Sequence, residues 1–358
     1  MQRHLFSSAF VVCLLIQCAM AENWPEFRGP RGDGQTTADL PIKFSATENV
    51  VWKTPVIGKA WSSPVVWGDQ IWVTNAMKDG HKLWAICLDA KTGEKLKELL
   101  VFEIAKPQFC IDYNSYASPT PAIEEGRVYV SFGVHGTACI DTKTFETLWT
   151  RQDLECNHFR GPASSPIIDG DKLILQFDGF DVQYVVALDK KTGETVWKHD
   201  RVIDYPKGDN GDWKKAYGTP AVVTHAGRRQ LICPSAAATE SLDPKTGKRF
   251  WIAYHHGMNA AARPVYGHGL VFITNGHGAM IAVPPEGTGD ISDKIAWEGR
   301  KMTPKKPSLI LVDDMLFMIK DDGVLSCVEP KTGEAIWSQR LKGEFDASKL
   351  RQSATIHQ

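Results

Sequence analysis

The sequence has no adjacent pair of cysteines, no Cys-x-x-Cys and, after residue 21, no apolar run long enough to cross a bilayer. The first two absences leave a zinc ribbon and a thioredoxin-like centre without support. The third argues against a transmembrane helix, which needs about 20 apolar residues. A charge surplus is also lacking, because 41 basic residues face 42 acidic ones. A chain of that balance is not expected to bind nucleic acid.

Recognised catalytic and metal-binding motifs are equally scarce. There is no Gly-x-Ser-x-Gly, no phosphate-binding loop and no kinase signature. The histidines lack a His-x-x-x-His spacing, and Asp209, Asn210 and Asp212 do not follow the order of an EF-hand loop. We therefore name no catalytic residue and no metal ligand, and we expect a protein that is not an enzyme.

The first 21 residues have the three parts of a secretory signal peptide. Arg3 and the following histidine make a basic start, residues 5–18 form a short apolar core, and Ala19-Met20-Ala21 ends the segment with small residues. We predict cleavage after Ala21 and export to the periplasm or the extracellular space.

Six cysteines follow this segment, an even number that would permit disulfides outside the cytoplasm. Cys87, Cys139 and Cys327 fall in strand-like runs at related positions of a repeat. We interpret them as small buried residues, and disulfide pairing stays open.

A turn-flanked pair of strand-like segments recurs along the chain, each time opened by a proline. Residues 63–73 give its clearest copy. The opening prolines are Pro64, Pro119, Pro166, Pro220, Pro264 and Pro307. Their mean spacing of about 49 residues is typical of propellers and solenoids. Within each unit the segments are short, β-branched and alternating, and no amphipathic helix interrupts them.

A second signal alternates with the first and ends in tryptophan. Its best copy, residues 188–197, contains Asp-Lys-Lys-Thr-Gly-Glu and closes on Trp197. Four short strands in each repeat describe a propeller blade, which must be covered by its neighbours because it is too thin to bury both faces alone. We expect one indole at the end of each outer strand to dock on the next blade: Trp149, Trp197, Trp251, Trp297 and Trp337.

The repeated Asp-x-Lys-Thr-Gly-Glu-x-x-Trp resembles the quinoprotein-like, or pyrroloquinoline-quinone-like, β-propeller repeat family. Residues 24–34, 114–119, 158–166 and 264–269 are similar to motifs of a secreted bacterial subgroup. The resemblance implies an all-β propeller of four-stranded antiparallel blades.

The resemblance also implies eight blades, whereas this sequence has six complete units. We therefore expect a C-terminally truncated chain whose ring is left open. The predicted organisation is a signal peptide (1–21), an N-terminal extension (22–48), propeller repeats (49–345) and a divergent polar tail (346–358). Within the repeats, residues 49–54 mimic an outer strand and are expected to serve the last blade.

The loops that lead into the innermost strands should surround one mouth of the central channel. They carry aromatic and cationic residues that could hold an anionic, planar or sugar-like ligand by stacking and charge-assisted hydrogen bonds. The candidate ligand-binding residues are Trp61, Tyr116, His158, Arg160, Tyr217, Arg263 and Lys306. The alternative is that these aromatic rings pack against neighbouring loops.

The function expected from the sequence is that of an exported, non-catalytic scaffold that binds an unidentified protein or ligand. Two alternatives stay open. One is an oxidoreductase that uses pyrroloquinoline quinone with calcium, which is disfavoured because the family's adjacent cysteine pair is missing. The other is a carbohydrate-binding module.

Overall fold

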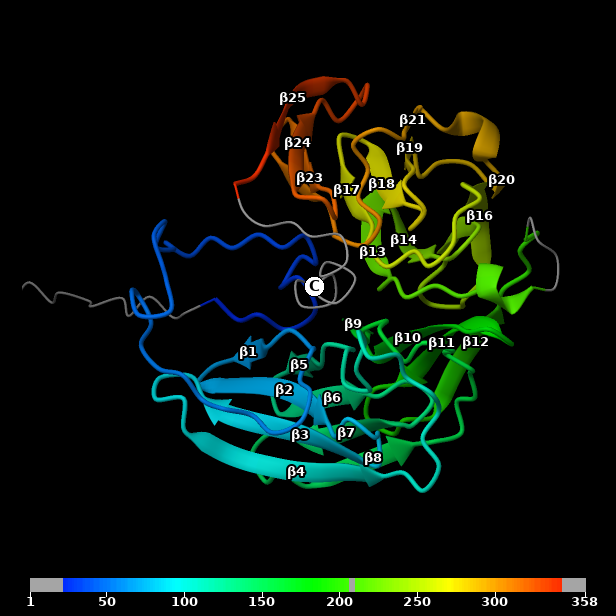
Figure 1. Cartoon of the computed structure of the whole chain (residues 1–358). Helices are drawn as coiled ribbons and strands as arrows, with labels where there is room; N and C mark the ends of the chain where they lie inside the picture. Colours follow the sequence, from blue (N-terminus) through cyan, green and yellow to red (C-terminus); the bar gives the residue numbers. More distant parts are fainter. Residues whose placement is uncertain (1–21, 206–209, 343–358) are drawn as a thin grey trace, which may run out of the picture.

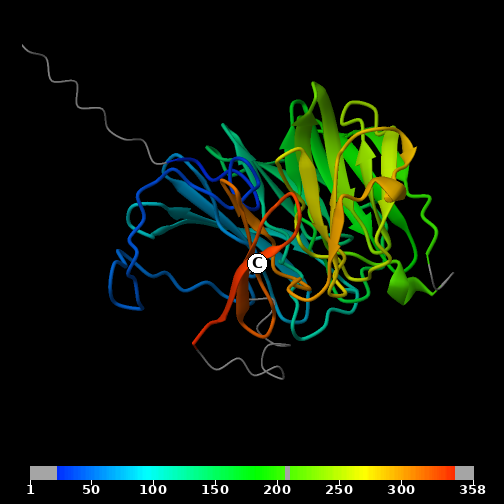
Figure 2. The ribbon, with the colours of Figure 1, turned by 90° about the horizontal axis from the view of Figure 1, so that it is seen from above.

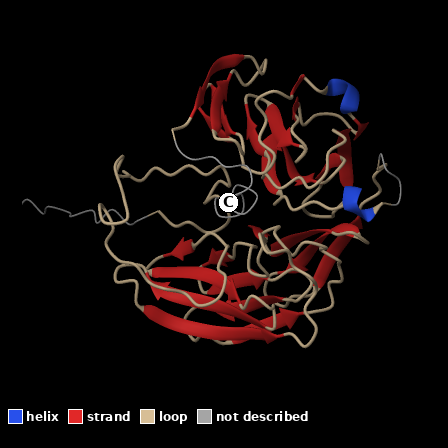
Figure 3. Ribbon diagram, viewed as in Figure 1, coloured by secondary structure: helices blue, strands red, loops and turns tan. Residues whose placement is uncertain are grey.

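The computed structural model describes residues 22–205 and 210–342. Six antiparallel sheets lie in an arc around a common centre, and the first strand of each sheet is the innermost (Figure 1). The described part contains two short 3-10 helices, η1 (Gly211–Trp213) and η2 (Ser292–Lys294), drawn in blue in Figure 3. The all-β propeller with six four-stranded blades is therefore confirmed.

The first three blades follow the chain order without exception. Blade 1 consists of β1 (Val65–Trp67), β2 (Gln70–Ala76), β3 (Lys82–Asp89) and β4 (Lys95–Glu103). Blade 2 consists of β5 (Ala122–Glu124), β6 (Arg127–Ser131), β7 (Thr137–Asp141) and β8 (Thr147–Arg151). Blade 3 consists of β9 (Ile167–Asp169), β10 (Lys172–Asp178), β11 (Gln183–Asp189) and β12 (Thr195–Asp200).

The later blades contain one irregularity. Blade 4 consists of β13 (Ala221–His225), β14 (Arg228–Pro234), β15 (Ala238–Leu242) and β16 (Arg249–Tyr254). Blade 5 consists of β17 (Val265–Gly267), β18 (Leu270–Thr274), β19 (Met280–Val283) and β21 (Trp297–Gly299). The short β20 (Gly289–Asp290) leaves blade 5 and pairs in parallel with β16. Blade 6 consists of β22 (Ile310–Val312), β23 (Met315–Ile319), β24 (Val324–Val328) and β25 (Ala335–Arg340).

The recurring Asp-x-Lys-Thr-Gly sequence forms the turn between the third and outer strands. In blade 3 the carboxylate of Asp189 accepts hydrogen bonds from the amides of Lys191 and Thr192, at 2.8 and 2.9 Å. The amide of Gly193 donates to the carbonyl of Asp189 at 2.8 Å. Gly193 has a φ of 77°, a conformation that glycine adopts without steric cost. The motif is therefore a turn, as its sequence predicts.

Apolar residues are buried between blades, in one cluster at each of the five junctions from blade 1 to blade 6. Among the described residues no such cluster joins blade 6 to blade 1. Trp52 and Val56 instead pack on blade 1 against Trp84 and Ile86. Figure 2 shows the blue N-terminal loops on the side of the arc away from the green and yellow blades. The arc is thus open between its two end blades in the described structure.

Indole rings dock on the turn of the blade that follows them in sequence through a repeated hydrogen bond. In each case the indole N–H donates to the carbonyl one residue after the acidic residue of the next turn. The pairs are Trp52 with Ala90 (3.1 Å), Trp149 with Lys190 (3.1 Å), Trp197 with Pro244 (3.1 Å) and Trp297 with Pro330 (2.8 Å). Each ring covers the turn glycine so closely that a Cβ there would lie within 3 Å of it.

Two of the five tryptophans named from the sequence depart from this arrangement. Trp251 is fully buried, but its indole N–H donates to the side chain of Gln230, which in turn donates to the carbonyl of Pro285. In blade 5 the connection between the third and outer strands lacks the Asp-x-Lys-Thr-Gly sequence, and the glutamine joins the ring to Pro285 in that connection. Trp337 is 39% exposed and contacts Phe317 of its own blade. Among the described residues no following blade offers it a turn.

All six cysteines in the described residues are free thiols, five of them buried. Cys139 lies opposite Trp149, and Cys327 lies opposite Trp337. A small side chain at this position leaves room for the indole on the same face of the sheet. The predicted signal peptide (1–21) and polar tail (346–358) lie outside the described residues.

Candidate functional site

The N-terminal segment, residues 22–35, crosses the centre of the arc. The backbone of Trp24 pairs with Val66 of β1. At the other end of the arc, Arg28 donates to the carbonyl of Leu309, directly before β22, at 2.5 Å. The segment therefore touches the innermost strands of both end blades and closes part of the channel (Figure 1).

Arg263, which the sequence places at the channel mouth, contacts this N-terminal segment. Its guanidinium donates to the carbonyl of Phe27 and lies 2.7 Å from the carboxylate of Glu26. Its side chain is only 4% exposed. Two of its nitrogens are thus already hydrogen-bonded to the N-terminal segment. These contacts join residues more than 230 positions apart, so a local motif does not reveal them.

Trp61 and Tyr217 do come together, as residues of one channel mouth. They line a cavity together with Phe27 of the N-terminal segment. The volume of this cavity is about 10 Å³, which is room for about one water molecule. This cavity does not admit a sugar-sized or planar ligand in this conformation.

Tyr116 and His158 are packed among loops. The hydroxyl of Tyr116 donates to the carbonyl of Gln108 at 2.6 Å. The Nε2 atom of His158 accepts from the amide of Val134 at 3.0 Å. Burial of His158 lowers its pKa to about 3, and nearby His135 adds to the shift, so the ring is neutral at physiological pH. Both side chains position loops.

Arg160, Lys215 and Lys306 come from the loops before blades 3, 4 and 6, and they converge at this mouth. We call them the mouth cations. Lys215 donates to the carbonyl of Asp212 at 2.9 Å and forms an ion pair with its carboxylate. Arg160 lies 3.9 Å from the same carboxylate. Lys306 donates to the carbonyl of Asn259 at 2.8 Å, and the amide of Asn259 donates to the carbonyl of Lys215.

The mouth cations are electrostatically unfavourable to one another. Burial lowers the pKa of Lys215 to about 8, and the charges of Arg160 and Lys306 add to the shift. Burial also lowers the pKa of Lys306 to about 8, against an opposing effect of Asp321 and with further contributions from Arg160 and Lys305. Lys215 is fully buried, whereas Arg160 keeps a third of its side chain exposed. The positive charge at this mouth is therefore destabilised by burial and by repulsion between the cations.

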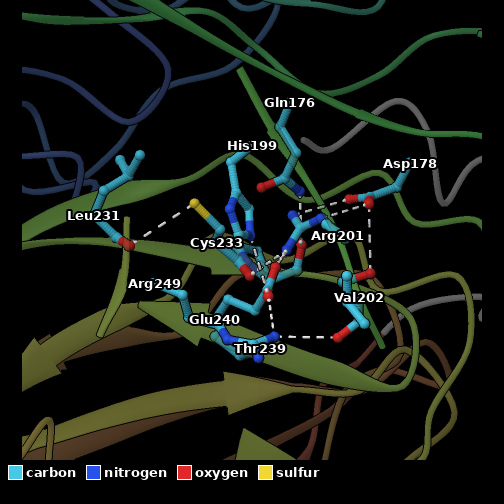
Figure 4. Close-up of polar contacts among 12 residues, drawn as sticks. Gln176, Asp178, His199, Arg201, Val202, Leu231, Cys233, Thr239, Glu240 and Arg249 are labelled. Atoms are coloured by element: carbon cyan, nitrogen blue, oxygen red, sulfur yellow. Dashed lines mark hydrogen bonds and ion pairs between the residues drawn. The ribbon is translucent and has the colours of Figure 1, made fainter. Parts of the chain in front are cut away.

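A buried ionic network fixes the segment that carries Lys215. Figure 4 shows Arg201 between Asp178 and Glu240, at 2.8 and 2.9 Å. Arg249 and His199 also reach Glu240, at 2.9 and 3.3 Å. All of these partners come from blades 3 and 4.

Asp178 holds both ends of the segment that connects these blades. Its carboxylate pairs with Arg201 at the start of the segment, and its carbonyl accepts from the amide of Ala216 at the end. Burial raises the pKa of Asp178 to about 6 although Arg201 opposes the shift. The network thereby positions Lys215, next to Ala216, at the mouth.

Sequence reasoning named Arg160 and Lys306 but did not single out Lys215 or the buried network. The available signal was the presence of charged residues inside apolar strand runs, such as Asp178 after Leu-Gln-Phe and Glu240 between Thr and Ser. Charged residues are almost never fully buried unless they are paired. The identity of the partners depends on which blades adjoin, and the sequence alone does not give it.

Residues of the N-terminal segment also line a larger cavity of about 360 Å³. Ile123 and Ile167 form part of its apolar wall, and Glu124 and Arg229 lie at its polar side. These charged groups are already paired, Glu124 with Lys190 and Arg229 with Asp169. The cavity is large enough for a small ligand, but its charges are balanced.

The uncovered face of blade 6 is a third candidate. It consists of the residues on the side that would meet a following blade: Ile310, Met315, Phe317, Leu325 and Trp337. Cross-strand pairing places Ile310, Phe317, Cys327 and Trp337 in one row. Ile310, Met315 and Trp337 are each more than a third exposed. We call this surface the open face.

Within the described ranges, no group of three or more His, Cys, Asp and Glu side chains is arranged to hold a metal ion. The described residues also contain no helix of the length and apolarity that a membrane crossing needs.

Comparison with solved structures shows the same fold in BamB from Moraxella catarrhalis, with a TM-score of 0.61 and 18% identity over 83% of this chain and 81% of that one. Quinohemoprotein alcohol dehydrogenase from Comamonas testosteroni aligns less well, with a TM-score of 0.47 and 14% identity over 90% of this chain and 73% of that one. No curated protein matches the chain.

A family model described as outer membrane protein assembly factor BamB matches residues 86–237 and 187–339. These two matches together cover more than half of the chain and include blades 2 to 6. The chain belongs to this family of pyrroloquinoline-quinone-like repeat β-propellers.

Proposed function

We propose that the protein is an exported, non-catalytic scaffold that binds a partner protein through the open face of blade 6. The observation that carries this proposal is the different surroundings of equivalent tryptophans. Trp149 and Trp197 are 9% and 8% exposed beneath the next blade, whereas Trp337 is 39% exposed. The open face is therefore the one Trp-bearing face that the described chain leaves without a following blade.

The apolar side chains of the open face are unfavourably exposed to water. Contiguous exposed apolar patches on soluble proteins typically mark interaction sites. Covering such a surface stabilises a complex by roughly 25 cal/mol for each Å² removed from water. The family description, which names an outer membrane protein assembly factor, supports a role in contacts between proteins.

The test is site-specific photo-crosslinking in the cell that makes the protein. A photoreactive residue at Gln339 lies in the outer strand of blade 6, on the same side as Trp337. The matched control is Lys198 in β12, which is exposed but belongs to a blade that is covered. We expect a crosslink to one other protein from position 339 and none from position 198. Equal crosslinking at both positions, or crosslinking at 339 to this chain alone, would contradict the proposal.

The two alternative functions are decided by separate measurements. An oxidoreductase that uses pyrroloquinoline quinone with calcium is disfavoured because the chain has no adjacent cysteine pair. Saturable binding of pyrroloquinoline quinone with calcium, seen as an absorbance change and a raised thermal midpoint, would favour the oxidoreductase. Protection of Trp61 fluorescence by a polysaccharide would favour the carbohydrate-binding module.

A further inference from the structure

The mouth cations have few acidic partners in the described part of the chain. Arg160, Lys215 and Lys306 lie together with Lys305, whose charge also acts on Lys306. The carboxylates that act on them are Asp212, which is paired with Lys215, and Asp321. Within residues 22–205 and 210–342, four cationic side chains thus face two carboxylates. Lys306 has only the carbonyl of Asn259 as its hydrogen-bond acceptor among the described residues.

The cations are held in place by the fold, because their loops are joined to one another. Asp212 lies between Lys215 and Arg160, and Asn259 connects the backbone of Lys215 to the ammonium group of Lys306. The ammonium group of Lys215 also lies 5.0 Å from the ring centroid of Phe159, at cation–π distance. A surface lysine would move freely, whereas this arrangement is positioned before any ligand arrives.

We propose that Arg160 and Lys306 form a binding site for a compact oxyanion, a phosphate or carboxylate group, at the channel mouth, with Lys215 as a buried supporting charge. Arg160 supplies a planar pair of donors suited to such a group. Lys306 is half-buried and provides the second contact. Lys215 has no exposed surface and acts through its charge. This site is separate from the open face and does not depend on the proposed scaffold function.

The size of the ligand group follows from the space available. The neighbouring cavity between Trp61 and Tyr217 has a volume of about 10 Å³. A large planar or sugar ring has no room in that cavity, which Arg160 and Lys306 do not line, so we place the bound group against these two side chains instead. Any larger molecule that carries the oxyanion would extend from there into solvent.

The test is calorimetric titration of the full chain with sulfate, a dianion whose charge is constant between pH 6.5 and 9.5, and in parallel with inorganic phosphate and acetate. At pH 6.5 we expect saturable sulfate binding that Arg160→Gln and Lys306→Gln each weaken at least tenfold. Lys306→Arg should retain most of the affinity because it keeps the charge. Lys301→Gln removes an exposed charge from the same loop and should leave binding unchanged. Stronger binding of phosphate than of acetate would identify the group as a phosphate, and the reverse would identify a carboxylate.

The pH dependence provides a second readout that a purely structural role would not change. Lys215 and Lys306 both lose protons near pH 8, so sulfate affinity should fall at least tenfold between pH 6.5 and 9.5. Circular dichroism shows whether a variant is folded. If a variant is unfolded, the pH dependence of sulfate binding to the unsubstituted protein tests the proposal by itself. Absence of saturable binding, affinity that is constant with pH, or equal weakening by Lys301→Gln would overturn the proposal.

Discussion

Lys97 and Phe145 form the contact between blades 1 and 2 that a tryptophan and a glycine form at other junctions. Lys97 stands at the tryptophan position of the outer strand, and Phe145 stands at the glycine position of the turn. Lys97 lies opposite Cys87 in blade 1, at the position that Trp149 and Trp337 occupy in their blades. Phe145 stands in the turn of blade 2 where other turns have glycine, and its φ is 63°. Its ring packs into the cluster between blades 1 and 2, 5.9 Å from the Lys97 ammonium group. The turn therefore supplies the aromatic ring that the outer strand lacks.

This exchange predicts a rescue. Phe145→Ala should destabilise the protein by about 1–3 kcal/mol, because a half-buried ring is lost from the junction. The double variant Lys97→Trp with Phe145→Gly should recover most of that loss, since it rebuilds the usual indole-on-glycine contact and relieves the positive φ. A urea titration measures each free energy of unfolding. If the double variant is no more stable than Phe145→Ala, the two arrangements are not equivalent.

Removal of a covered indole should cost far more than removal of the exposed one. We expect Trp197→Ala to lower the free energy of unfolding by about 3–5 kcal/mol, because it leaves a cavity over Gly247. Trp337→Ala should cost less than about 1 kcal/mol, since its ring lies on an uncovered face. Denaturant titrations of both variants make the comparison. Similar losses would show that Trp337 is covered in solution.

Substitutions at two turn glycines can separate the cost of a positive φ from the cost of a steric clash with the indole ring. Gly193 and Gly126 have φ values of 77° and 79°. A Cβ at Gly193 would lie 2.8 Å from the ring of Trp149, whereas nothing lies within 4 Å of one at Gly126. Gly193→Ala should therefore cost at least about 1 kcal/mol more than Gly126→Ala. Thermal midpoints of the two variants give the difference, and equal midpoints would mean that the indole does not press on the turn.

The mouth lysines should make the protein more stable in alkaline solution. Their pKa values fall from the usual 10.5 to about 8 on folding. Between these values the unfolded chain binds more protons than the folded one, so the free energy of unfolding rises as pH increases from about 8 to 10.5. Urea titrations across this range should show the rise, with a smaller slope in Lys306→Met. An unchanged slope in that variant would contradict the assigned burial of Lys306.

The repeat architecture could be predicted because its determinants are local. Each repeat is marked by a proline, a short alternating run and an Asp-x-Lys-Thr-Gly turn, and each of these signals spans only a few residues. The turn at Asp189 and Gly193 can therefore be predicted from its own sequence. The docking predicted for Trp337 is not seen among the described residues, where no blade follows it and its ring is 39% exposed, because docking depends on a neighbouring blade rather than on the local sequence. Trp251 differs because blade 5 replaces the glycine turn with β20 and the loop at Pro285.

The candidate site was harder to predict because its contacts join distant parts of the chain. The order of the repeats shows which loops lead to the mouth, and Arg160 and Lys306 could be predicted as candidates because they lie in these loops. The closing of the channel by residues 22–35 depends on Arg263 meeting Glu26, and the placement of Lys215 depends on Asp178 meeting Arg201. Neither pair has a signature in the sequence, since each is defined only once the blades have assembled.

The most direct test of the scaffold function is the affinity of the partner identified by crosslinking for two purified variants. Trp337→Glu places a charge on the open face, and Lys198→Glu changes an exposed residue on a covered blade. If the partner binds at the open face, the first weakens binding at least tenfold, equivalent to about 1.4 kcal/mol, while the second leaves it unchanged. Equal affinities of the two variants for the partner would contradict binding at that face.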